Sequence, residues 1–417
     1  MHLKFINTKK ITLFLLIISF IKNINSHVFL VNKKPQEIMI KVLLNKLSST
    51  PKTILSLKSK NGLFIDTKDN NKKLFISEPF MELMVKDGQL FIAAKNHITN
   101  KITSKKIESN KIEINAVNGN IEYNKINYSG KLVFLIDKTD KEKNLLIISK
   151  LSLDAYVYSV VGSEIYPTWP FEMQKVQAII SRTYAINLIN ENNNKKQKQL
   201  YHIKNNNFHQ KYNGEHNYKR LKQAVIETKG EIITYKNKPI LAMFDACCGG
   251  IDTSKMSALN YKAAPYLSRK TPCNYCKNYE LYRWQVNYPV QNFIDKLKKN
   301  LDIAKKLVGT KKLLDIKIMK QDKAGIVKRI KLIFSNKEIT LNASQFWENL
   351  KENVRSLNFT IKKINNKIII NGKGYGHQTG LCQRGAYELV NRGWDYKSII
   401  KFYYPGVDFA VLQYAKA

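Results

Sequence analysis

The stretch at residues 153–186 constrains the fold more than any other part of the chain, because a helical pattern stops there and then starts again. The helical pattern breaks at Gly162, the acid Glu164 follows, and the chain turns through Pro167 and Pro170. Pro170 suits the start of a new helix, where its missing N–H costs nothing. Apolar residues then recur at three- and four-residue steps, which buries one helix face. The stretch therefore predicts two helices joined by an elbow that carries one carboxylate.

The N-terminus has the residue order of a secretory signal peptide. Lysines precede an apolar run at residues 11–21, and Asn25 and Ser26 follow it with a small residue at the expected cleavage point. The run is too short to span a bilayer comfortably, although an uncleaved anchor is the alternative. We expect residues 1–26 to be a signal peptide. The mature protein is then secreted, periplasmic or otherwise in the cell envelope, with no stable transmembrane segment after cleavage.

The chain is strongly basic, with a formal net charge of +38 from 70 Lys plus Arg against 32 Asp plus Glu. Such a charge attracts polyanions. However, Lys greatly outnumbers Arg and is spread along the whole chain, as a general composition bias would produce. Nucleic-acid recognition relies on arginine forks and clustered aromatic residues, and the sequence has no basic stripe of that kind. We expect no nucleic-acid partner, and a polyanion-binding surface protein is the weakest of the functional alternatives.

The part before the elbow shows β-type patterns. Over residues 27–129, short apolar alternations are separated by turn signals such as Asp87-Gly88, which predicts a β-rich part of antiparallel sheets. The polar segment 99–110 predicts a loop. Residues 131–136 and 145–148 predict a further strand pair that leads into the first helix of the elbow.

The part after the elbow mixes both patterns, so the fold class is α+β, with antiparallel sheets and helices that frame a substrate groove. The predicted elements are a helix at 218–230, strands at 231–235 and 240–244, one amphipathic helix at 293–307, and strands at 314–320 and 327–334.

Two separated segments resemble the SpoIID/LytB family, the stage II sporulation protein D type of cell-wall protein. They are residues 153–186 and the glycine-rich residues 372–386, the latter followed by Tyr403-Tyr404-Pro405-Gly406. Shorter pieces between them, including Gly249-Gly250, match in the same order. The resemblance implies a SpoIID-like fold. It makes residues 130–410 the catalytic region, with an α+β subregion at 285–370, and residues 27–129 the variable N-terminal part.

The resemblance also implies peptidoglycan chemistry. Proteins of the sporulation type are lytic transglycosylases that act on glycan strands stripped of stem peptides, and the other branch stimulates a separate amidase. We therefore expect an exported lytic transglycosylase that cleaves the MurNAc-GlcNAc bond, leaves anhydromuramyl ends and requires no cofactor. The alternative is a non-catalytic wall-binding protein that recruits or stimulates an N-acetylmuramoyl-L-alanine amidase. The expected partners are glycan strands and that amidase.

The family's catalytic glutamate corresponds to Glu164. If the first helix ends near Gly162, the carboxylate lies beside a partial negative charge that disfavours ionisation by ~0.3–1 kcal/mol. Tyr166 and Trp169 would add desolvation, which also raises a carboxyl pKa. A carboxyl group that is still protonated near neutral pH can protonate a glycosidic oxygen.

A hydrolase would need a second carboxylate across the bond. The nearby acids Asp154 and Glu172 lie on separate helices, and the resemblance supports neither. For Lys175 and Arg182 the alternative to substrate binding is ordinary salt bridging on the helix surface, and for His377 it is a packed structural histidine. The resemblance places substrate-binding residues at Lys175, Arg182, Tyr184, Gln210, Tyr212, Gly249, Gly250, His377 and Gln383.

The cysteines allow a metal site. Some family members bind zinc through a Cys/His cluster before the Gln-x-Tyr pair, but the corresponding positions here are Lys204, Phe208 and His209, so that cluster is not preserved. The chain has five cysteines, and an odd count with an adjacent pair and a Cys-x-x-Cys is not a tidy disulfide framework.

Three states of these cysteines remain open. Cys-x-x-Cys is a standard zinc half-site, whereas export permits disulfides, and free thiols are the third state. The four residues that we expect to form either a structural zinc site, alone or with His209, or a disulfide between the two pairs are Cys247, Cys248, Cys273 and Cys276.

Overall fold

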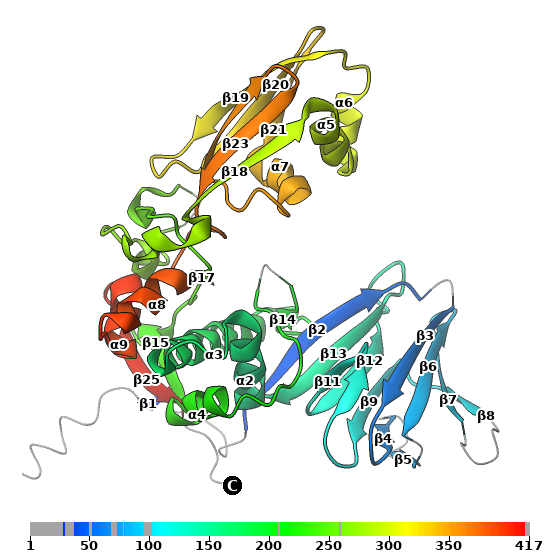
Figure 1. Ribbon diagram of the computed structural model, residues 1–417. Coiled ribbons are helices and arrows are strands. Elements are labelled where there is room, and N and C mark those ends of the chain that lie inside the picture. Colours follow the sequence, from blue (N-terminus) through cyan, green and yellow to red (C-terminus); the bar gives the residue numbers. More distant parts are fainter. Residues whose placement is uncertain are drawn as a thin grey trace, which may run out of the picture.

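The computed structural model describes residues 28–29, 37–49, 52–67, 73–77, 79–95, 102–206, 209–257 and 260–412. It contains helices and several antiparallel sheets, which confirms the predicted α+β class (Figure 1). The signal peptide predicted at residues 1–26 lies outside the described residues. Within the described ranges, no helix is long and apolar enough to cross a membrane.

Two sheets with a shared core make up the N-terminal part (Figure 1). One has the strand order β11-β10-β3-β6-β7-β8, and the other β14-β2-β13-β12-β9-β4-β5. Alternate residues of β6 point inward, as the period of a strand requires. The bounds are β2 (Met39–Leu47), β3 (Thr53–Lys58), β4 (Leu63–Asp66), β5 (Lys73–Ile76), β6 (Phe80–Lys86), β7 (Gln89–Lys95), β8 (Ile102–Ile107), β9 (Lys111–Ala116), β10 (Ile121–Tyr123), β11 (Ile126–Tyr128), β12 (Lys131–Ile136), β13 (Leu145–Ser152) and β14 (Ile203–Lys204).

The loop predicted at 99–110 is wrong for residues 102–107, which form β8 and pair with β7. A strand at the edge of a sheet can be polar, because only part of its surface is buried and charged residues protect its free edge. The strand pair predicted at 131–136 and 145–148 is confirmed as β12 and β13.

The predicted helix, elbow and helix are confirmed as α2 (Leu153–Glu164) and α3 (Phe171–Asn193). β13 runs directly into α2, where the hydroxyl of Ser152 accepts a hydrogen bond from the N–H of Ala155. Gly162 does not end the helix: α2 continues to Glu164. A Cβ at Gly162 would collide with the ring of His216, so the glycine permits close packing rather than a helix stop.

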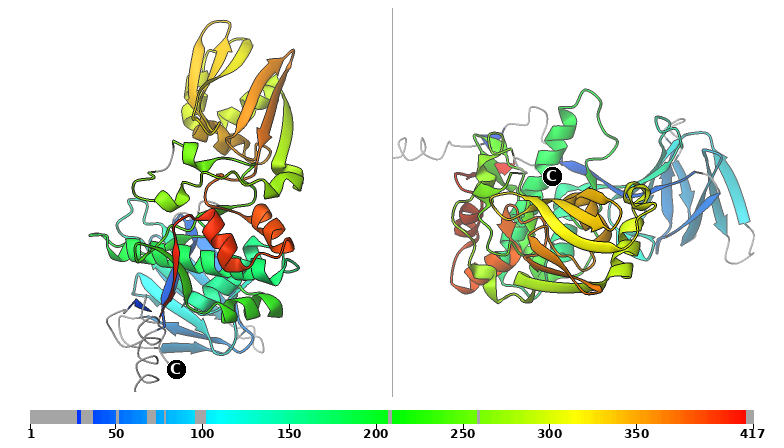
Figure 2. Two further views of the ribbon diagram at one scale, coloured as in Figure 1. Left: turned by 90° about the vertical axis from the view of Figure 1, so that its left-hand side faces the viewer. Right: turned by 90° about the horizontal axis from the view of Figure 1, so that it is seen from above.

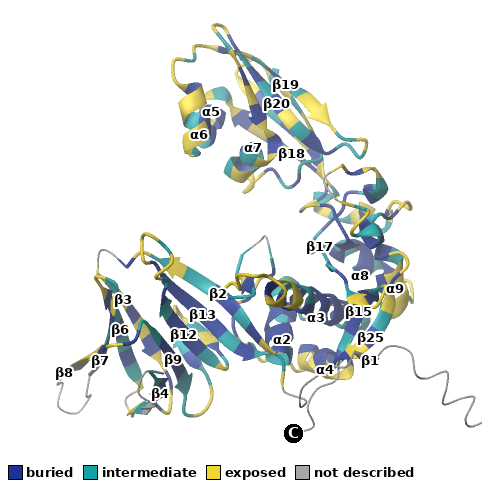
Figure 3. Ribbon diagram, turned by 180° about the vertical axis from the view of Figure 1, so that it is seen from behind, coloured by how far each residue is buried: buried dark blue, intermediate teal, exposed yellow. Residues whose placement is uncertain are grey.

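The long helix α3 lies at the centre of the molecule and is buried on all sides in its middle (Figure 3). Every residue from 176 to 186 is buried, although the sequence pattern predicts only one buried face. Polar side chains in this segment therefore need partners inside the protein.

The neighbours of α3 come from both halves of the chain. α4 (Lys219–Glu227) packs on it, as does the sheet of order β1-β25-β15-β16 through β15. The other elements are β1 (Val28–Phe29), β15 (Glu231–Tyr235), β16 (Lys238–Pro239), β17 (Phe244–Asp245), β24 (Leu381–Cys382), α8 (Gln383–Asn391), α9 (Tyr396–Tyr403) and β25 (Asp408–Leu412).

The strand predicted at 240–244 is wrong. Only Phe244 of that segment lies in a strand, β17, which pairs in parallel with β24. The N–H groups before it have other partners, since Ile240 donates to the carbonyl of Ile233 and Leu241 donates to the hydroxyl of Tyr266.

Residues 283–373 form a unit that projects from the central helices (Figures 1 and 2). It has its own hydrophobic core, which includes Phe293 and Phe346. The helix predicted at 293–307 is in fact two helices, because the side chain of Asn300 caps the second one by accepting from the N–H of Ile303. The elements are β18 (Arg283–Pro289), α5 (Val290–Lys298), α6 (Leu301–Leu307), β19 (Leu313–Gln321), β20 (Val327–Phe334), β21 (Glu338–Asn342), α7 (Ala343–Leu350), β22 (Phe359–Ile364) and β23 (Lys367–Lys373).

Gly380, which precedes β24, should tolerate no side chain. Its φ of +74° already favours glycine, and a Cβ there would collide with the carbonyl oxygen of Met243. Gly393 has a similar φ of +85° but open space around it, so it is a matched control. We expect Gly393→Ala to cost ~1–2 kcal/mol of unfolding free energy and Gly380→Ala more than ~4 kcal/mol, measured by urea unfolding. Equal losses would show that packing at Gly380 is unimportant.

Candidate functional site

The elbow and the glycine-rich segment meet in the structure. Gln383, the first residue of α8, donates from its side-chain nitrogen to the backbone carbonyl of Glu164 at 3.5 Å. The same nitrogen donates to the side chain of Gln177 on α3 at 3.2 Å. One amide group thus connects the end of α2, the middle of α3 and the start of α8. The predicted groove around this junction stays a prediction.

The carboxyl group of Glu164 is half-buried at the C-terminal end of α2. Its Oε1 accepts a hydrogen bond of 2.6 Å from the backbone N–H of Lys211. Burial raises the pKa of Glu164 above its usual value, and the Lys211 N–H and positive charge oppose that rise. The partial negative charge of the helix end also disfavours the ionised form. Glu164 therefore holds its proton more strongly than an exposed glutamate does.

Gln210 and Tyr212 anchor the chain segment that carries this N–H. The hydroxyl of Tyr156 donates to Gln210 Oε1 at 2.9 Å, and the hydroxyl of Tyr212 lies 3.0 Å from that of Ser149. Both side chains are buried, whereas Lys211 between them is exposed. Their side chains are therefore directed away from the surface and hold the Lys211 N–H in place, and their contact with sugar stays a prediction.

Tyr184 lies beside the same segment. Its hydroxyl is 3.3 Å from Nδ1 of His209, and burial raises the pKa of Tyr184 to about 12. Burial also lowers the pKa of His209, so this ring is neutral at pH 7. Phe208, another position of the family's zinc cluster, lies outside the described residues.

Arg182 does not lie near Glu164. It is 0% exposed, and it donates to the backbone carbonyls of Glu231 at 3.2 Å and Val225 at 3.3 Å. Its Nε is 3.7 Å from the carboxylate of Asp154. Asp154 and Glu164 lie at opposite ends of α2, ~15 Å apart along the helix axis. Arg182 thus connects α2, α4 and β15 from inside, and its contact with substrate stays a prediction.

Lys175 is also occupied elsewhere. Its ammonium group lies 3.1 Å from Glu172 and 3.0 Å from Glu227, so it links α3 to α4. This is the salt bridging that the sequence left open as an alternative to substrate binding.

The other predicted binding residues lie around the glycine-rich segment. Gly249 has a φ of +63°, and a Cβ there would press on the backbone of Gly374. Gly250 leaves room for the hydroxyl of Tyr282 in the same way. His377 is exposed, and its Nδ1 accepts from the N–H of Thr379 at 3.1 Å. The glycines thus serve close backbone packing, while the His377 ring is held by the backbone of Thr379.

From the sequence, Tyr166 and Trp169 were predicted at the elbow, but Arg384 and Tyr279, which lie beside them, were missed. The guanidinium of Arg384 lies 5.7 Å from the ring of Tyr166, 5.1 Å from that of Trp169 and 4.3 Å from that of Tyr279. Tyr166 is 60% exposed, whereas Trp169 is buried. The position of Arg384 beside Gln383 was a signal that could have identified it, but nothing in the sequence marked Tyr279.

The cysteines form a buried cluster. The sulfurs of Cys248, Cys273, Cys276 and Cys382 all lie within 4.8 Å of one another, and all five cysteines are free thiols. The set contains Cys382 where the sequence predicted Cys247. The pairing of β17 with β24 brings the segment after residue 380 against residues 244–248, and local spacing could not reveal that contact.

Comparison with known proteins identifies the family. Residues 141–235 match the sequence model of a family described as Stage II sporulation protein, and residues 251–380 match a second one, described as a domain of unknown function (DUF8618). An uncharacterised protein of Brachyspira hyodysenteriae is 37% identical over 287 residues, which are 68% of this chain and 73% of that relative.

Relatives with functional names are more distant. Stage II sporulation protein D of Bacillus subtilis is 28% identical over 276 residues, 63% of this chain and 76% of that protein. The amidase enhancer of Bacillus subtilis is 25% identical over 296 residues, 59% of this chain and 39% of that protein.

The structure thus brings a half-buried glutamate at a helical elbow into contact with a glycine-rich segment from the far end of the chain. The chain belongs to the SpoIID/LytB family, which confirms the resemblance seen in its sequence.

The raised pKa of Glu164 predicts a pH-dependent effect of Glu164→Gln on stability. A carboxyl group whose pKa is raised in the folded state stabilises the protein at pH values below its ordinary pKa of about 4.3. This contribution to the unfolding free energy is lost as pH rises through the folded-state pKa. Glu164→Gln should therefore gain stability relative to the unchanged protein as pH rises, with no difference in acid. Urea unfolding at a series of pH values measures this.

Glu227→Gln is the control of opposite sign. The ion pair with Lys175 lowers the pKa of Glu227, so this substitution should lose stability at neutral pH and match the unchanged protein in acid. If Glu164→Gln lowered the unfolding free energy at neutral pH, as Glu227→Gln should, this would contradict the raised pKa of Glu164.

The burial of Arg182 predicts a structural role. Arg182→Met leaves Asp154 and two carbonyl groups without this partner, so we expect a loss of ~3–5 kcal/mol in unfolding free energy. Lys175→Met removes a partly exposed ion pair and should cost ~1 kcal/mol or less. Thermal and urea unfolding of both variants test this. If Arg182→Met were as stable as Lys175→Met but bound glycan poorly, Arg182 would be a substrate contact instead.

Proposed function

We propose that this chain is an exported lytic transglycosylase that acts on peptidoglycan glycan strands, with Glu164 as its single general acid and base. The observation that carries the proposal is a half-buried carboxyl group with a raised pKa, held by one main-chain N–H at the end of α2. Membership of the SpoIID/LytB family and relatives named Stage II sporulation protein D support a role in the cell wall.

The proposed reaction needs one carboxyl group and no water. Protonated Glu164 donates its proton to the glycosidic oxygen between MurNAc and GlcNAc, and the bond from this oxygen to C1 of the muramyl sugar breaks. The C6 hydroxyl of the same sugar then bonds to C1, and its proton passes to the Glu164 carboxylate. The products are an anhydromuramyl end and a free GlcNAc hydroxyl, and Glu164 is protonated again.

The surroundings of Glu164 suit both of its protonation states. Burial favours the acid that starts the reaction, as in other carboxyl groups that protonate leaving groups. The Lys211 N–H stabilises the carboxylate after proton transfer, because a hydrogen bond to the charged form favours that form. The two opposing effects allow the same group to give a proton and to take one back.

The acids considered for a two-carboxylate hydrolase are engaged elsewhere. Asp154 faces Arg182 at the other end of α2. Glu172 pairs with Lys175 and accepts from the N–H of Tyr396 at 3.0 Å. These contacts favour the transglycosylase over hydrolysis by inversion or retention, which needs a second carboxylate across the bond.

Arg384, rather than Lys175 or Arg182, is the cation that we propose for binding the lactyl carboxylate of the muramyl sugar. Its guanidinium lies over the rings of the elbow, whereas Lys175 pairs with carboxylates of α3 and α4, and Arg182 is buried against backbone carbonyls. A planar guanidinium binds a carboxylate in bidentate fashion. The exposed ring of Tyr166 next to it offers a face on which a sugar can stack.

The second candidate function is a non-catalytic protein of the cell wall that stimulates an amidase. The observation that favours it is the similarity to an amidase enhancer, which covers 59% of this chain. In that case Glu164 would bind glycan without cleaving it. Both functions require export, which agrees with the residue order at the N-terminus.

Glu164→Gln distinguishes the two functions. Glutamine can still accept the Lys211 N–H but cannot donate the proton, so we expect a loss of anhydromuramyl product of at least ~100-fold. The assay is mass spectrometry of products from glycan with and without stem peptides, where an anhydromuramyl end is one water lighter than a reducing end. Glu172→Gln is the matched control and should keep the activity.

Two outcomes would overturn the proposal. Undiminished product from Glu164→Gln would refute the catalytic assignment, and loss of activity with Glu172→Gln would point to a second carboxylate. If the unchanged protein bound glycan, released nothing and accelerated a purified amidase, the second candidate function would hold.

A further inference from the structure

We propose that Cys248, Cys273, Cys276 and Cys382 bind one structural zinc ion. The proposal does not rest on the function proposed above, because it concerns a buried cluster whose thiols do not contact Glu164 in the structure. The four sulfurs lie within 4.8 Å of one another, and all four residues are buried. Four thiolates in one place are the donor set of closed structural zinc sites.

The spacing of the sulfurs fits a metal ion better than disulfides. Cys248 Sγ and Cys276 Sγ are 3.8 Å apart. A tetrahedral site with Zn–S bonds of ~2.3 Å has sulfur pairs separated by ~3.8 Å, whereas a disulfide brings its sulfurs to ~2.05 Å. The distance between these two thiols is thus already that of two ligands on one zinc ion.

The four ligands come from two half-sites. Cys273 and Cys276 form a Cys-x-x-Cys at the 3₁₀ turn η3 (Tyr275–Asn278), the usual zinc half-site. Cys248 lies shortly after β17, and Cys382 is the last residue of β24. Because these two strands pair, they bring together a second half-site from positions 134 residues apart.

Hydrogen-bond donors face two of the four sulfurs. Cys382 Sγ accepts from the N–H groups of Cys248 and Gly385, both at 3.3 Å, and it caps the N-terminus of α8. The partial positive charge at that helix end stabilises an anion. The hydroxyl of Tyr403 lies 3.1 Å from Cys273 Sγ and can donate to it. Such outer contacts orient metal ligands and tune their charge.

A buried cation close to Tyr403 would balance the negative charge of a zinc ion with four thiolates. Arg269 is 3% exposed, and its guanidinium lies 5.4 Å from the ring of Tyr403, the residue that touches Cys273. Among the described residues, its Nε and Nη2 have no hydrogen-bond partner. A buried charge is costly unless an opposite charge compensates it. The net charge of a four-thiolate zinc centre, minus two, supplies that compensation.

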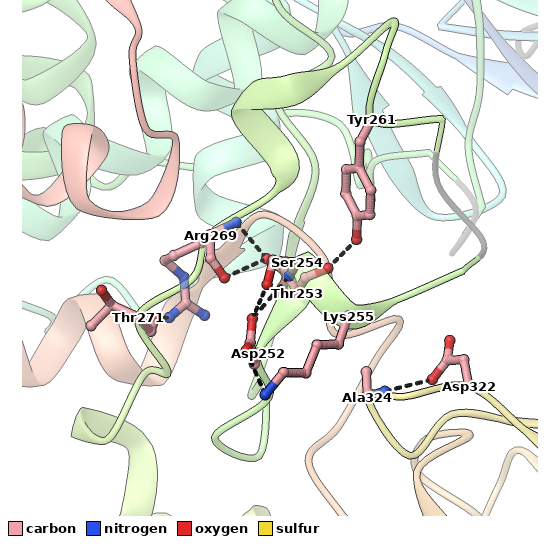
Figure 4. Close-up of polar contacts among 9 residues, drawn as sticks. All are labelled: Asp252, Thr253, Ser254, Lys255, Tyr261, Arg269, Thr271, Asp322 and Ala324. Carbon is pink, nitrogen blue, oxygen red and sulfur yellow. Dashed lines mark hydrogen bonds and ion pairs between the residues drawn. The ribbon is translucent and has the colours of Figure 1, made fainter.

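The backbone around the cluster is held by a dense set of polar contacts (Figure 4). The hydroxyl of Thr253 donates to the carbonyl of Leu267 at 2.8 Å and accepts from the N–H of Arg269 at 2.8 Å. Arg269 also donates from its side chain to the carbonyl of Thr271, shortly before Cys273. These contacts tie the segment that follows Cys248 to the segment that leads to the Cys-x-x-Cys, so the half-sites are placed together by the fold itself.

Gly385 shows how closely α8 approaches the cluster. A Cβ at this position would collide with the hydroxyl of Tyr403 and come within 2.5 Å of Cys273 Sγ. The zinc ion would therefore fix the first turn of α8, whose first residue, Gln383, binds the backbone of Glu164. The metal would be a positioning element that holds the glycine-rich segment against the elbow.

The first experiment uses the full chain without substitutions. It is purified without chelators, and its metals are measured by plasma mass spectrometry. We expect one zinc ion per chain, and five titratable thiols after denaturation with a chelator. After replacement of zinc by cobalt, we expect thiolate-to-cobalt charge-transfer absorption together with the visible bands of tetrahedral cobalt. Absence of stoichiometric metal, or disulfides among these cysteines in peptide mapping, would overturn the proposal.

The second experiment compares Cys382→Ser with Cys247→Ser. Both residues are buried, but Cys247 lies outside the set of four. We expect Cys382→Ser to lose stoichiometric zinc and Cys247→Ser to keep it, with the unchanged cobalt spectrum. The reverse result would overturn the assigned ligand set in favour of Cys247. If Cys382→Ser fails to fold, the metal content and cobalt spectrum of the unchanged chain still decide whether the site exists.

Discussion

The complete burial of the middle of α3 is the constraint on which the rest of the structure depends. A helix enclosed on every side must find internal partners for each polar side chain, since water cannot reach them. Arg182 binds carbonyl groups in α4 and in β15, Thr183 accepts from the N–H of Ile233, and Gln177 accepts from Gln383. These partners belong to α4, β15 and α8, so the internal hydrogen bonds of α3 also fix where those three elements lie. The position of Gln383 beside Glu164 is one result.

Patterns within a short stretch of sequence predicted the local structure well. The helices on either side of the elbow follow from apolar periodicity and from Pro170, and β12 and β13 follow from two apolar runs around a turn. The proposed role of Glu164 as an acid came from the resemblance, and its structural setting agrees with the physical argument for a raised pKa.

The contacts between distant segments could not be predicted in the same way. Periodicity showed that α3 has an apolar face but not that its polar face is also covered, so Arg182 seemed available to substrate. The inward direction of Gln210 and Tyr212 depends on hydrogen bonds to Tyr156 and Ser149, from elements at least 54 residues earlier. Cys382 joins the other three thiols through the parallel pairing of β17 and β24, and no spacing rule relates those positions.

The projecting unit of residues 283–373 begins and ends at one place, because Arg283 and Lys373 are paired neighbours in β18 and β23. Its core is separate from that of the central helices. A segment whose two ends already lie side by side can be lengthened, shortened or exchanged at little entropic cost to the body that carries it. Evolution can therefore change the length or sequence of this unit independently, while the elbow and Glu164 keep their positions.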